Sequence, residues 1–272
     1  MYLFIRGQVV FLGFFSTKIT RQPWITEKIR YYYNNKVRLR LGIIMCGRFT
    51  LSYKTKELQL ALGLPENQLD WQPRYNIAPS QPIAAILDNQ TKKIDFLRWG
   101  LVPGWAKDIS IGNRLINARS ETIMEKPSFR NAFVRRRCLI LADGFFEWKR
   151  SNSKGGSSQP YYFFLEEKQP FALAGIWEIW QAPDGGELWS TAIVTCDAND
   201  VVKPVHERMP VIFAKDEMFT WLEDRPKNEI IKMMRSYPAE KMNSYMVGKA
   251  VNSPFNDVEE CIREKKPNSF PF

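Results

Sequence analysis

Met45-Cys46-Gly47-Arg48-Phe49-Thr50 is the stretch from which the fold and the chemistry of this 272-residue chain are inferred. If translation starts at Met45, the small residue that follows permits removal of the methionine and leaves Cys46 as the N-terminus. An N-terminal cysteine can attack one aldehyde carbon twice, first through its α-amine to give an imine and then through its thiol to close a thiazolidine ring. The alternative is that Cys46 is a small buried residue at the start of a strand, because free cysteine is among the most buried residue types.

The reactivity of such a terminus follows from the ordinary pKa values of its two groups. The α-amine has an unperturbed pKa near ~7.8, against ~10.4 for a lysine, so its free-base fraction at neutral pH is roughly 400-fold larger. The thiol, with a reference pKa of ~8.5, is the stronger nucleophile once it is ionised.

Composition and charge place the chain among globular proteins. Its length is sufficient to bury a substantial core, and its aromatic content is 14%. The net charge of +10 suggests a nucleic-acid partner, but residues 1–44 hold eight of the 39 Lys and Arg residues and one of the 29 Asp and Glu residues. That segment therefore carries +7 of the charge, and +3 remains for the rest. Any affinity for DNA must come from local clustering of basic side chains.

Cysteine and histidine usage limits the metal chemistry. The four cysteines, Cys46, Cys138, Cys196 and Cys261, are far apart in the chain, and there is one histidine. The usual ligand spacings cannot assemble a zinc site from these residues. We therefore expect no metal, no organic cofactor, and free thiols in a reducing, cytoplasmic setting.

Residues 1–44 differ from residues 45–272. The apolar run Val9–Phe15 is shorter than the ~20 residues of a membrane span and lacks a small-residue cleavage site, so neither a span nor a signal peptide is expected. Three interpretations remain open for the segment: a start assigned too far upstream, a pro-segment removed before Cys46, or a retained extension. The change in charge near residue 45 favours the first. The third would leave Cys46 without an α-amine.

The pattern of short strands and few helices predicts an α+β fold. Residues 45–272 show neither a βαβ rhythm nor an internal repeat, so we expect a single domain built on an antiparallel, barrel-like β core. Asp70–Pro82, with three prolines, is expected to be an extended loop without regular structure. Helices are predicted at Thr55–Leu62, Asp216–Leu222 and Lys227–Met234, with a brief one at Ser120–Glu125, and strands at Ile83–Leu87, Lys93–Trp99, Cys138–Ala142, Tyr161–Leu165, Phe171–Trp177, Leu188–Cys196 and Val211–Phe213.

Six separated segments in a fixed order carry a family resemblance. They are Met45–Thr50, Arg74-Tyr75-Asn76-Ile77-Ala78-Pro79, Arg98–Trp105, Leu115-Ile116-Asn117-Ala118-Arg119, Ala142-Asp143-Gly144-Phe145-Phe146-Glu147-Trp148 and Val205-His206-Glu207-Arg208-Met209-Pro210. Together they resemble the SRAP family, the SOS-response-associated, peptidase-like proteins that process abasic sites in DNA. The resemblance runs from Met45 to about Ile262 and includes Lys249–Asn256, which is similar to the family's closing motif and would pack against the sheet.

The resemblance implies four catalytic residues. Cys46 would be the nucleophile, and Glu147 would hold its α-ammonium and take its proton. Asn117 would orient the abasic sugar, and His206 would help to open the sugar and process the Schiff base, a task that suits an imidazole near neutral pH. Each of three residues has an ordinary alternative. Asn117 would cap a helix, Glu147 would face solvent on a strand, and His206 would be a surface or core residue.

The resemblance also suggests a DNA-binding track. Arg48 and Arg119 would contact phosphates beside the lesion, and Arg74 and Arg98 lie in neighbouring segments. Trp99 and Trp105 would stack on bases or hold a junction open, unless they are core residues.

We therefore expect an enzyme that senses abasic sites in single-stranded DNA and forms a covalent thiazolidine crosslink, which shields the lesion. A Schiff-base stage would permit a lyase side activity. We expect a monomer without a membrane partner, bound to the nucleoid when on DNA. The rival functions are a cysteine autopeptidase or hydrolase that uses the Cys46 thiol, and a DNA-binding module without covalent chemistry.

Overall fold

The computed structural model describes residues 3–5, 8–10, 47–66, 71–151, 153 and 156–265, with side chains from residue 47 onward. The chain divides into two units, Met1–Ile43 and Ile44–Phe272. In the first unit, β1 (Leu3–Ile5) pairs antiparallel with β2 (Gln8–Val10). The fold described below is that of the second unit.

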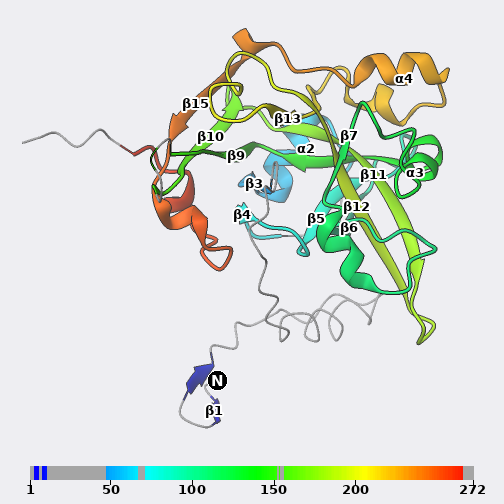
Figure 1. The fold of residues 1–272 in the computed structure, drawn as a ribbon, viewed down its shortest axis with the longest axis horizontal. Coiled ribbons are helices and arrows are strands. Elements are labelled where there is room, and N and C mark those ends of the chain that lie inside the picture. Colours follow the sequence, from blue (N-terminus) through cyan, green and yellow to red (C-terminus); the bar gives the residue numbers. More distant parts are fainter. Residues whose placement is uncertain are drawn as a thin grey trace, which may run out of the picture. The chain divides into compact units, whose positions relative to one another are not determined.

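Five strands of the larger sheet close into a barrel (Figure 1). They are β12 (Glu187–Asp197), β6 (Ile94–Trp99), β5 (Pro82–Ile86), β8 (Arg137–Ala142) and β11 (Phe171–Gln181), and β11 pairs again with β12. The predicted barrel-like core is thus confirmed, although it is mixed because β12 runs parallel to β6. Three short strands extend the sheet: β7 (Asn117–Arg119), β13 (Arg208–Pro210) and β14 (Ile212–Phe213).

A second, antiparallel sheet of five strands lies beside the barrel (Figure 1). Its order is β15 (Met242–Met246), β10 (Gln159–Leu165), β9 (Gly144–Lys149), β3 (Arg48–Leu51) and β4 (Arg74–Ile77). The chain passes from β8 in the barrel to β9 in this sheet at the single residue Asp143. Asp143 therefore marks the junction of the two sheets.

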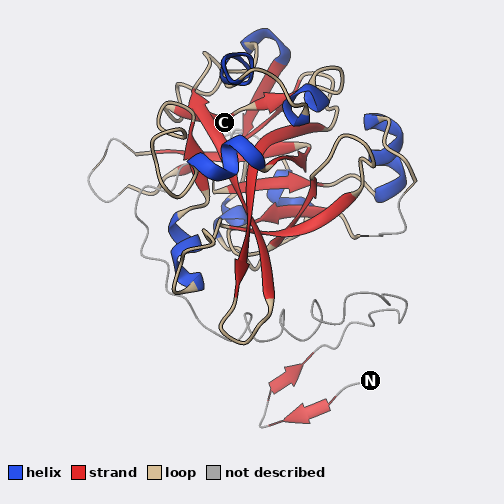
Figure 2. Ribbon diagram, turned by 90° about the vertical axis from the view of Figure 1, so that its right-hand side faces the viewer, coloured by secondary structure: helices blue, strands red, loops and turns tan. Residues whose placement is uncertain are grey.

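Short helices surround the strands (Figure 2). The α-helices are α2 (Thr55–Leu62), α3 (Arg130–Arg135) and α4 (Lys227–Met233), and the 3-10 helices are η1 (Ile109–Arg114), η2 (Met218–Leu222), η3 (Ala239–Lys241), η4 (Lys249–Asn252) and η5 (Glu259–Ile262). One large apolar cluster fills the barrel and extends under β3 and α2. A smaller cluster lies between β9, β10 and η4, and includes Phe146, Tyr162 and Val251. No helix in the described part of the chain is long and apolar enough to cross a membrane.

Local rules explain where the sequence prediction succeeded and failed. The predicted helix Thr55–Leu62 is confirmed as α2, which ends where Gly63 adopts a left-handed backbone (φ +65°) and its N–H returns to the carbonyls of the last turn. The prediction of a structureless Asp70–Pro82 is wrong, since β4 forms there. Pro73 and Pro79 lie just outside β4, so neither removes one of its ladder hydrogen bonds. The brief helix expected at Ser120–Glu125 is a series of turns.

Candidate functional site

The C-terminal half of β12 pairs with β7, which begins with Asn117, and with β13, which follows the loop of His206. β7 begins with Asn117, runs parallel to β12 and ends with Arg119 opposite Thr195. β13 pairs antiparallel with the same part of β12 and places Pro210 opposite Thr195. Because both strands pair with Thr195, they flank β12. Asn117 lies opposite Ile193 on one side of β12, and the loop before β13, which carries His206, lies beyond Asp197 on the other side.

The backbone of Arg208 orients the His206 ring. The backbone N–H of His206 donates to the carbonyl of Val202 at 3.0 Å, and its Nδ1 accepts the backbone N–H of Arg208 at 3.0 Å. The same Nδ1 lies 3.3 Å from the carbonyl oxygen of Arg208, to which a protonated Nδ1 would donate. Burial lowers the pKa of His206; its hydrogen bond with the Arg208 backbone and the charge of Glu207 oppose this, while the charges of Arg150 and Arg208 add to it. A neutral imidazole near pH 7 can accept or pass on a proton.

Arg208 is joined to the turn after β7 by a two-pronged ion pair. Its Nη1 donates to Oε1 of Glu121 at 2.5 Å, and its Nη2 donates to Oε2 at 2.9 Å. Nη1 also donates to Asp197 at 2.7 Å, and Nη2 to the carbonyl of Thr195 at 2.8 Å. The Nε of Arg208 and the Oγ1 of Thr195 are buried nearby, and neither has a hydrogen-bond partner among the described residues.

Neither Thr195 nor Arg208 was selected from the sequence. Arg208 stands two residues after His206 in a segment already singled out, so that proximity was an available signal. Nothing in the largely apolar run of β12 marks Thr195.

Glu147 lies in the middle of the second sheet. It is on β9 and is only 2% exposed, so the alternative of a solvent-facing glutamate is wrong. β9 pairs with β10 on one side and with β3 on the other, where Arg48 lies opposite Phe146. The same register, continued by one residue, places Gly47 beside Glu147. Cys46, which precedes Gly47 by one peptide bond, lies outside the described residues.

Trp99 is a core residue, contrary to the prediction that it stacks on DNA bases. Its side chain is fully buried, so neither ring face is open to a base. The ring packs edge-on against Phe49 with a centroid separation of 5.2 Å, and its Nε1 donates to the carbonyl of Ile116 at 3.0 Å. Trp99 thus links the strand that follows Cys46 to the residue before Asn117.

Arg98 binds the protein itself, contrary to the prediction of a phosphate contact. Its Nη1 donates to the carbonyl of Gly100 at 2.9 Å, and its Nη2 to Ser80 at 3.0 Å and to Asn113 at 2.9 Å. Gly100, with φ +118°, crosses Gly112 so closely that an added Cβ would lie 2.5 Å from the Gly112 carbonyl oxygen. The Arg98 guanidinium therefore fastens β6 to η1, the helix that leads towards β7.

A C-terminal strap, defined here as residues 249–257, covers the outer edge of β4. The fully buried Asn76 donates through Nδ2 to the carbonyl of Asn256 at 2.6 Å. Its Oδ1 accepts Nη1 of Arg48 at 2.9 Å, and the same nitrogen donates to the carbonyl of Val251 at 2.6 Å. The expectation that this closing segment packs against the sheet is confirmed.

Arg48 and Arg74 are both engaged with this strap rather than extended into solvent. Arg74 forms an ion pair with Asp257, whose Oδ1 accepts the backbone N–H groups of Tyr75 at 2.6 Å and Asn76 at 3.0 Å. Burial lowers the pKa of Arg48, and the electrostatic effect of Cys261 partly opposes this shift. In this arrangement the two arginines bind the strap.

The remaining predicted DNA contacts are exposed. Trp105 is 61% exposed in the loop after β6, and Arg119 is exposed at the end of β7. Trp148, which was not among the predicted DNA contacts, is half-buried and follows Glu147 in the chain. The guanidinium carbon of Arg48 lies 5.9 Å from the Trp148 ring centroid, so this indole borders the strand that follows Cys46.

The three described cysteines are unsuited to nucleophilic chemistry. Cys138, Cys196 and Cys261 are free and buried. Burial raises the pKa of the Cys138 and Cys196 thiols to about 12 and also raises that of Cys261. A thiol with such a pKa carries almost no thiolate at pH 7, and the thiolate is the nucleophile.

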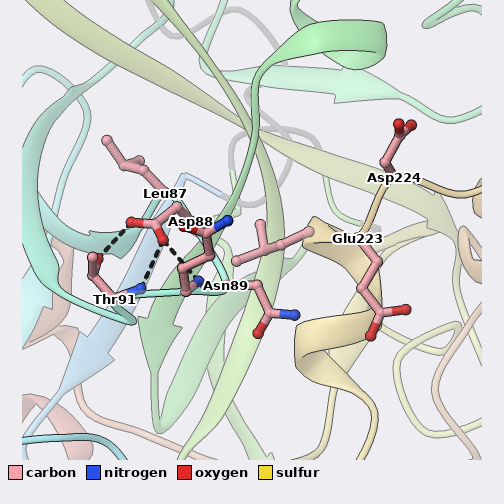
Figure 3. Close-up of a pocket in the computed structure, with 8 residues that line it drawn as sticks. Leu87, Asp88, Asn89, Thr91, Glu223 and Asp224 are labelled. Carbon is pink, nitrogen blue, oxygen red and sulfur yellow. Dashed lines mark hydrogen bonds between the residues drawn. The ribbon is translucent and has the colours of Figure 1, made fainter.

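A surface hollow lies away from the predicted site residues. It has a volume of about 660 Å³ and is formed by the β5–β6 turn and the residues after η2 (Figure 3). Asp88, Glu223 and Asp224 line it, and Asp88 is held by hydrogen bonds to Thr91. Three carboxylates would repel a phosphate backbone, and none of the predicted site residues lines this hollow.

Comparison with known proteins identifies the family of the chain. A model of the family described as SOS response associated peptidase (SRAP) matches residues 45–254. The chain belongs to the SRAP family. It is 41% identical over 227 residues to the abasic site processing protein YoqW of Bacillus subtilis, covering 80% of this chain and 99% of that protein. It is 32% identical over 264 residues to the abasic site processing protein HMCES of Gallus gallus, covering 80% of this chain and 77% of that one.

The SRAP fold also appears among solved structures. A protein from Bacteroides thetaiotaomicron is 26% identical and superposes with a TM-score of 0.71, covering 81% of this chain and all of that one. A second, from Bordetella bronchiseptica, is 22% identical with a TM-score of 0.64 and shares the fold. The expected family and fold are thus confirmed, and the chain belongs among proteins of abasic-site processing and DNA repair.

Proposed function

We propose that this SRAP protein captures the aldehyde of abasic sites in single-stranded DNA through Cys46 and shields the lesion as a covalent crosslink. The observation that supports the proposal is the register of β3 with β9: Arg48 lies opposite Phe146, so the same register continued by one residue brings Gly47 level with Glu147, which is 2% exposed. Cys46 precedes Gly47 in the sequence. We propose that the Glu147 carboxylate holds the α-ammonium of Cys46 and takes its proton.

The proposed reaction proceeds in two additions. The free α-amine of Cys46 adds to the aldehyde carbon of the ring-opened sugar, and loss of water gives the imine. The thiol then adds to the imine carbon as its proton passes to the nitrogen, which closes the thiazolidine. Asn117 orients the sugar, and His206, neutral near pH 7, moves the proton that opens the sugar ring. If the imine persists, loss of a proton beside it permits strand cleavage, a lyase side reaction.

The names of the relatives support abasic sites as the substrate, since both are called abasic site processing proteins. Arg119 and Trp105 are exposed and are proposed to contact a phosphate and a base of the single strand. We propose that the protein acts as a monomer in the cytoplasm.

The test is a denaturing gel after incubation with an oligonucleotide that carries one abasic site. The full-length gene product should give a slower band that survives detergent, and the Cys46→Ala and Cys46→Ser variants should not. Intact-mass measurement of the same protein should find a species that begins at Cys46. A wild-type protein without a crosslinked band, or an active species that still carries Met1, would contradict the proposal.

The family description as a peptidase favours one second candidate, a hydrolase that uses the thiol of Cys46 alone. Selective acetylation of the α-amine separates the two. Crosslinking requires the amine and should be lost, whereas thiol-dependent peptide cleavage does not require it and should persist.

A further inference from the structure

We propose that Glu121 is a positioning residue that acts through Arg208 to hold Asn117 in register with His206. The inference rests on the proposed crosslinking function and adds to it a residue that touches neither DNA nor the nucleophile. Glu121 follows β7 by two positions, and Arg208 opens β13, so their ion pair joins the two strands that flank the end of β12.

The ion pair has the geometry of a rigid link. Both terminal nitrogens of Arg208 face both oxygens of Glu121, at 2.5 and 2.9 Å, the paired arrangement that fixes orientation as well as distance. The Arg208 side chain is only 12% exposed. Burial tends to lower the pKa of Arg208, but Glu121 and Asp197 outweigh it and raise the pKa above its ordinary value. The guanidinium therefore stays charged and bound.

Arg208 has no terminal N–H left for a phosphate in this arrangement. Its four terminal protons are used by the two oxygens of Glu121, by Asp197 and by the Thr195 carbonyl. The backbone of Arg208 meanwhile orients the His206 ring. The same residue thus fixes the imidazole through its main chain and the β7 turn through its side chain.

A competing interpretation predicts the opposite result. If Glu121 merely occupied a phosphate-binding arginine, its removal would free Arg208 and tighten DNA binding while the rate at saturation stayed the same. If Glu121 positions Asn117, its removal should lower the saturating rate, because misplacement by ~1 Å costs up to ~100-fold in rate.

Asp197 provides a matched control. It accepts from the same guanidinium at 2.7 Å, but it lies opposite Arg208 within the β12–β13 pair and its side chain is 87% exposed. Asp197→Asn therefore changes the net charge as much as Glu121→Gln does and leaves the link to β7 in place. Nonspecific electrostatic effects on DNA affinity should be equal in the two variants.

The experiment measures crosslinking of the full chain to an abasic oligonucleotide, as the rate at saturation and the DNA concentration at half-saturation. We expect Glu121→Gln to lower the saturating rate about tenfold relative to Asp197→Asn, with similar half-saturation. In an Arg208→Gln background, Glu121→Gln should have no further effect. If Glu121→Gln does not melt cooperatively, Glu121→Asp takes its place, since it keeps the charge and is too short for the two-pronged contact.

Three results would overturn the inference. They are a saturating rate equal to that of Asp197→Asn, tighter half-saturation at an unchanged rate, or an undiminished effect of Glu121→Gln when Arg208 is already Gln. A wild-type protein that forms no crosslink would contradict the proposed function instead, so the two failures are distinguishable.

Discussion

Two tryptophans six positions apart have opposite surroundings, and this decides what each can contribute. Trp99 is fully buried between Phe49 and Ile116, whereas Trp105 is 61% exposed. Both come from one aromatic segment, Arg98–Trp105, in which the sequence does not distinguish core from surface. Burial therefore assigns Trp99 to stability and leaves Trp105 available to DNA.

Leucine substitutions at these two positions should separate stability from binding. Trp99→Leu should lower the free energy of unfolding by about 3 kcal/mol through the cavity and the lost hydrogen bond. It should leave affinity for single-stranded DNA nearly unchanged. Trp105→Leu should keep the stability within about 0.5 kcal/mol and weaken binding by about 1–3 kcal/mol. Urea denaturation and fluorescence anisotropy measure the two quantities, and equal behaviour of the two variants would contradict this assignment.

His206 is the single histidine in the sequence, so its titration can be followed without assignment of other imidazoles. Burial and the charges of Arg150 and Arg208 lower its pKa, against the opposing effects of Glu207 and its backbone hydrogen bond. The imidazole resonances should therefore titrate below the ordinary value of ~6.5. Because a positive charge disfavours protonation, Arg150→Gln should move the midpoint upward. A midpoint above the ordinary value in the wild-type protein, or a downward shift in Arg150→Gln, would be inconsistent with this geometry.

At the scale of elements, the strap depends on one buried side chain. Asn76 donates to the carbonyls of Ser253 at 2.9 Å and Asn256 at 2.6 Å and accepts from Arg48 at 2.9 Å. Alanine at this position would leave several polar groups without partners inside the protein. Such groups cost ~1–3 kcal/mol each.

Asn76→Ala should therefore lower the free energy of unfolding by about 3 kcal/mol and loosen the strap. Phe255, which is 89% exposed within the strap, provides the second measurement, because chymotrypsin cleaves after phenylalanine. Cleavage there should accelerate in Asn76→Ala relative to Asn252→Ala, whose side chain makes an exposed contact with Trp148. Equal cleavage rates in the two variants would show that Asn76 does not hold the strap.

The success of sequence prediction at this scale depended on whether the signal was local. The two strands of the β5–β6 hairpin and the helix α2 were predicted, because turn residues separate the strands and Gly63 follows the helix. β4 was missed because flanking prolines mask a strand whose partners, β3 and the strap, are distant in sequence. The same reason explains why the intramolecular contacts of three arginines were not predicted. Their partners Asn113, Val251 and Asp257 become neighbours of Arg98, Arg48 and Arg74 only in the fold.

For the site, motif resemblance identified candidate residues by type and order, and the fold shows which strands carry them and which of them are buried. Asn117 begins a strand that pairs with one side of β12, and His206 precedes a strand that pairs with the other side. Glu147 is buried where a sequence alone would place a solvent-facing strand residue. Thr195 carried no signal at all, because a polar residue in an apolar strand acquires meaning only from the strands beside it.

At the scale of the whole molecule, the barrel and the second sheet are joined at a buried carboxylate. Asp143 is 5% exposed at the passage from β8 to β9. It accepts the hydroxyl of Thr50, and both the backbone N–H (2.5 Å) and the hydroxyl (2.6 Å) of Ser52. Gly144 follows it because an added Cβ would lie 2.2 Å from the hydroxyl oxygen of Tyr162. The junction thus fixes the strand on which the proposed nucleophile depends.

This junction should leave a signature in the pH dependence of stability. Burial raises the pKa of Asp143 above its ordinary value, with the hydrogen bonds from Ser52 and Thr50 opposing. The unfolded state releases the Asp143 proton near the ordinary pKa of ~3.9, and the folded state releases it only at its own, higher pKa. The proton therefore stabilises the folded state fully below pH ~3.9, and this contribution is lost as the pH rises through the folded pKa. The difference in unfolding free energy between wild type and Asp143→Asn should therefore fall as the pH rises. Asp88, whose pKa is lowered by its bonds to Thr91, should give the opposite slope in Asp88→Asn. Urea denaturation at several pH values measures both, and slopes of the same sign would contradict the electrostatic account of the junction.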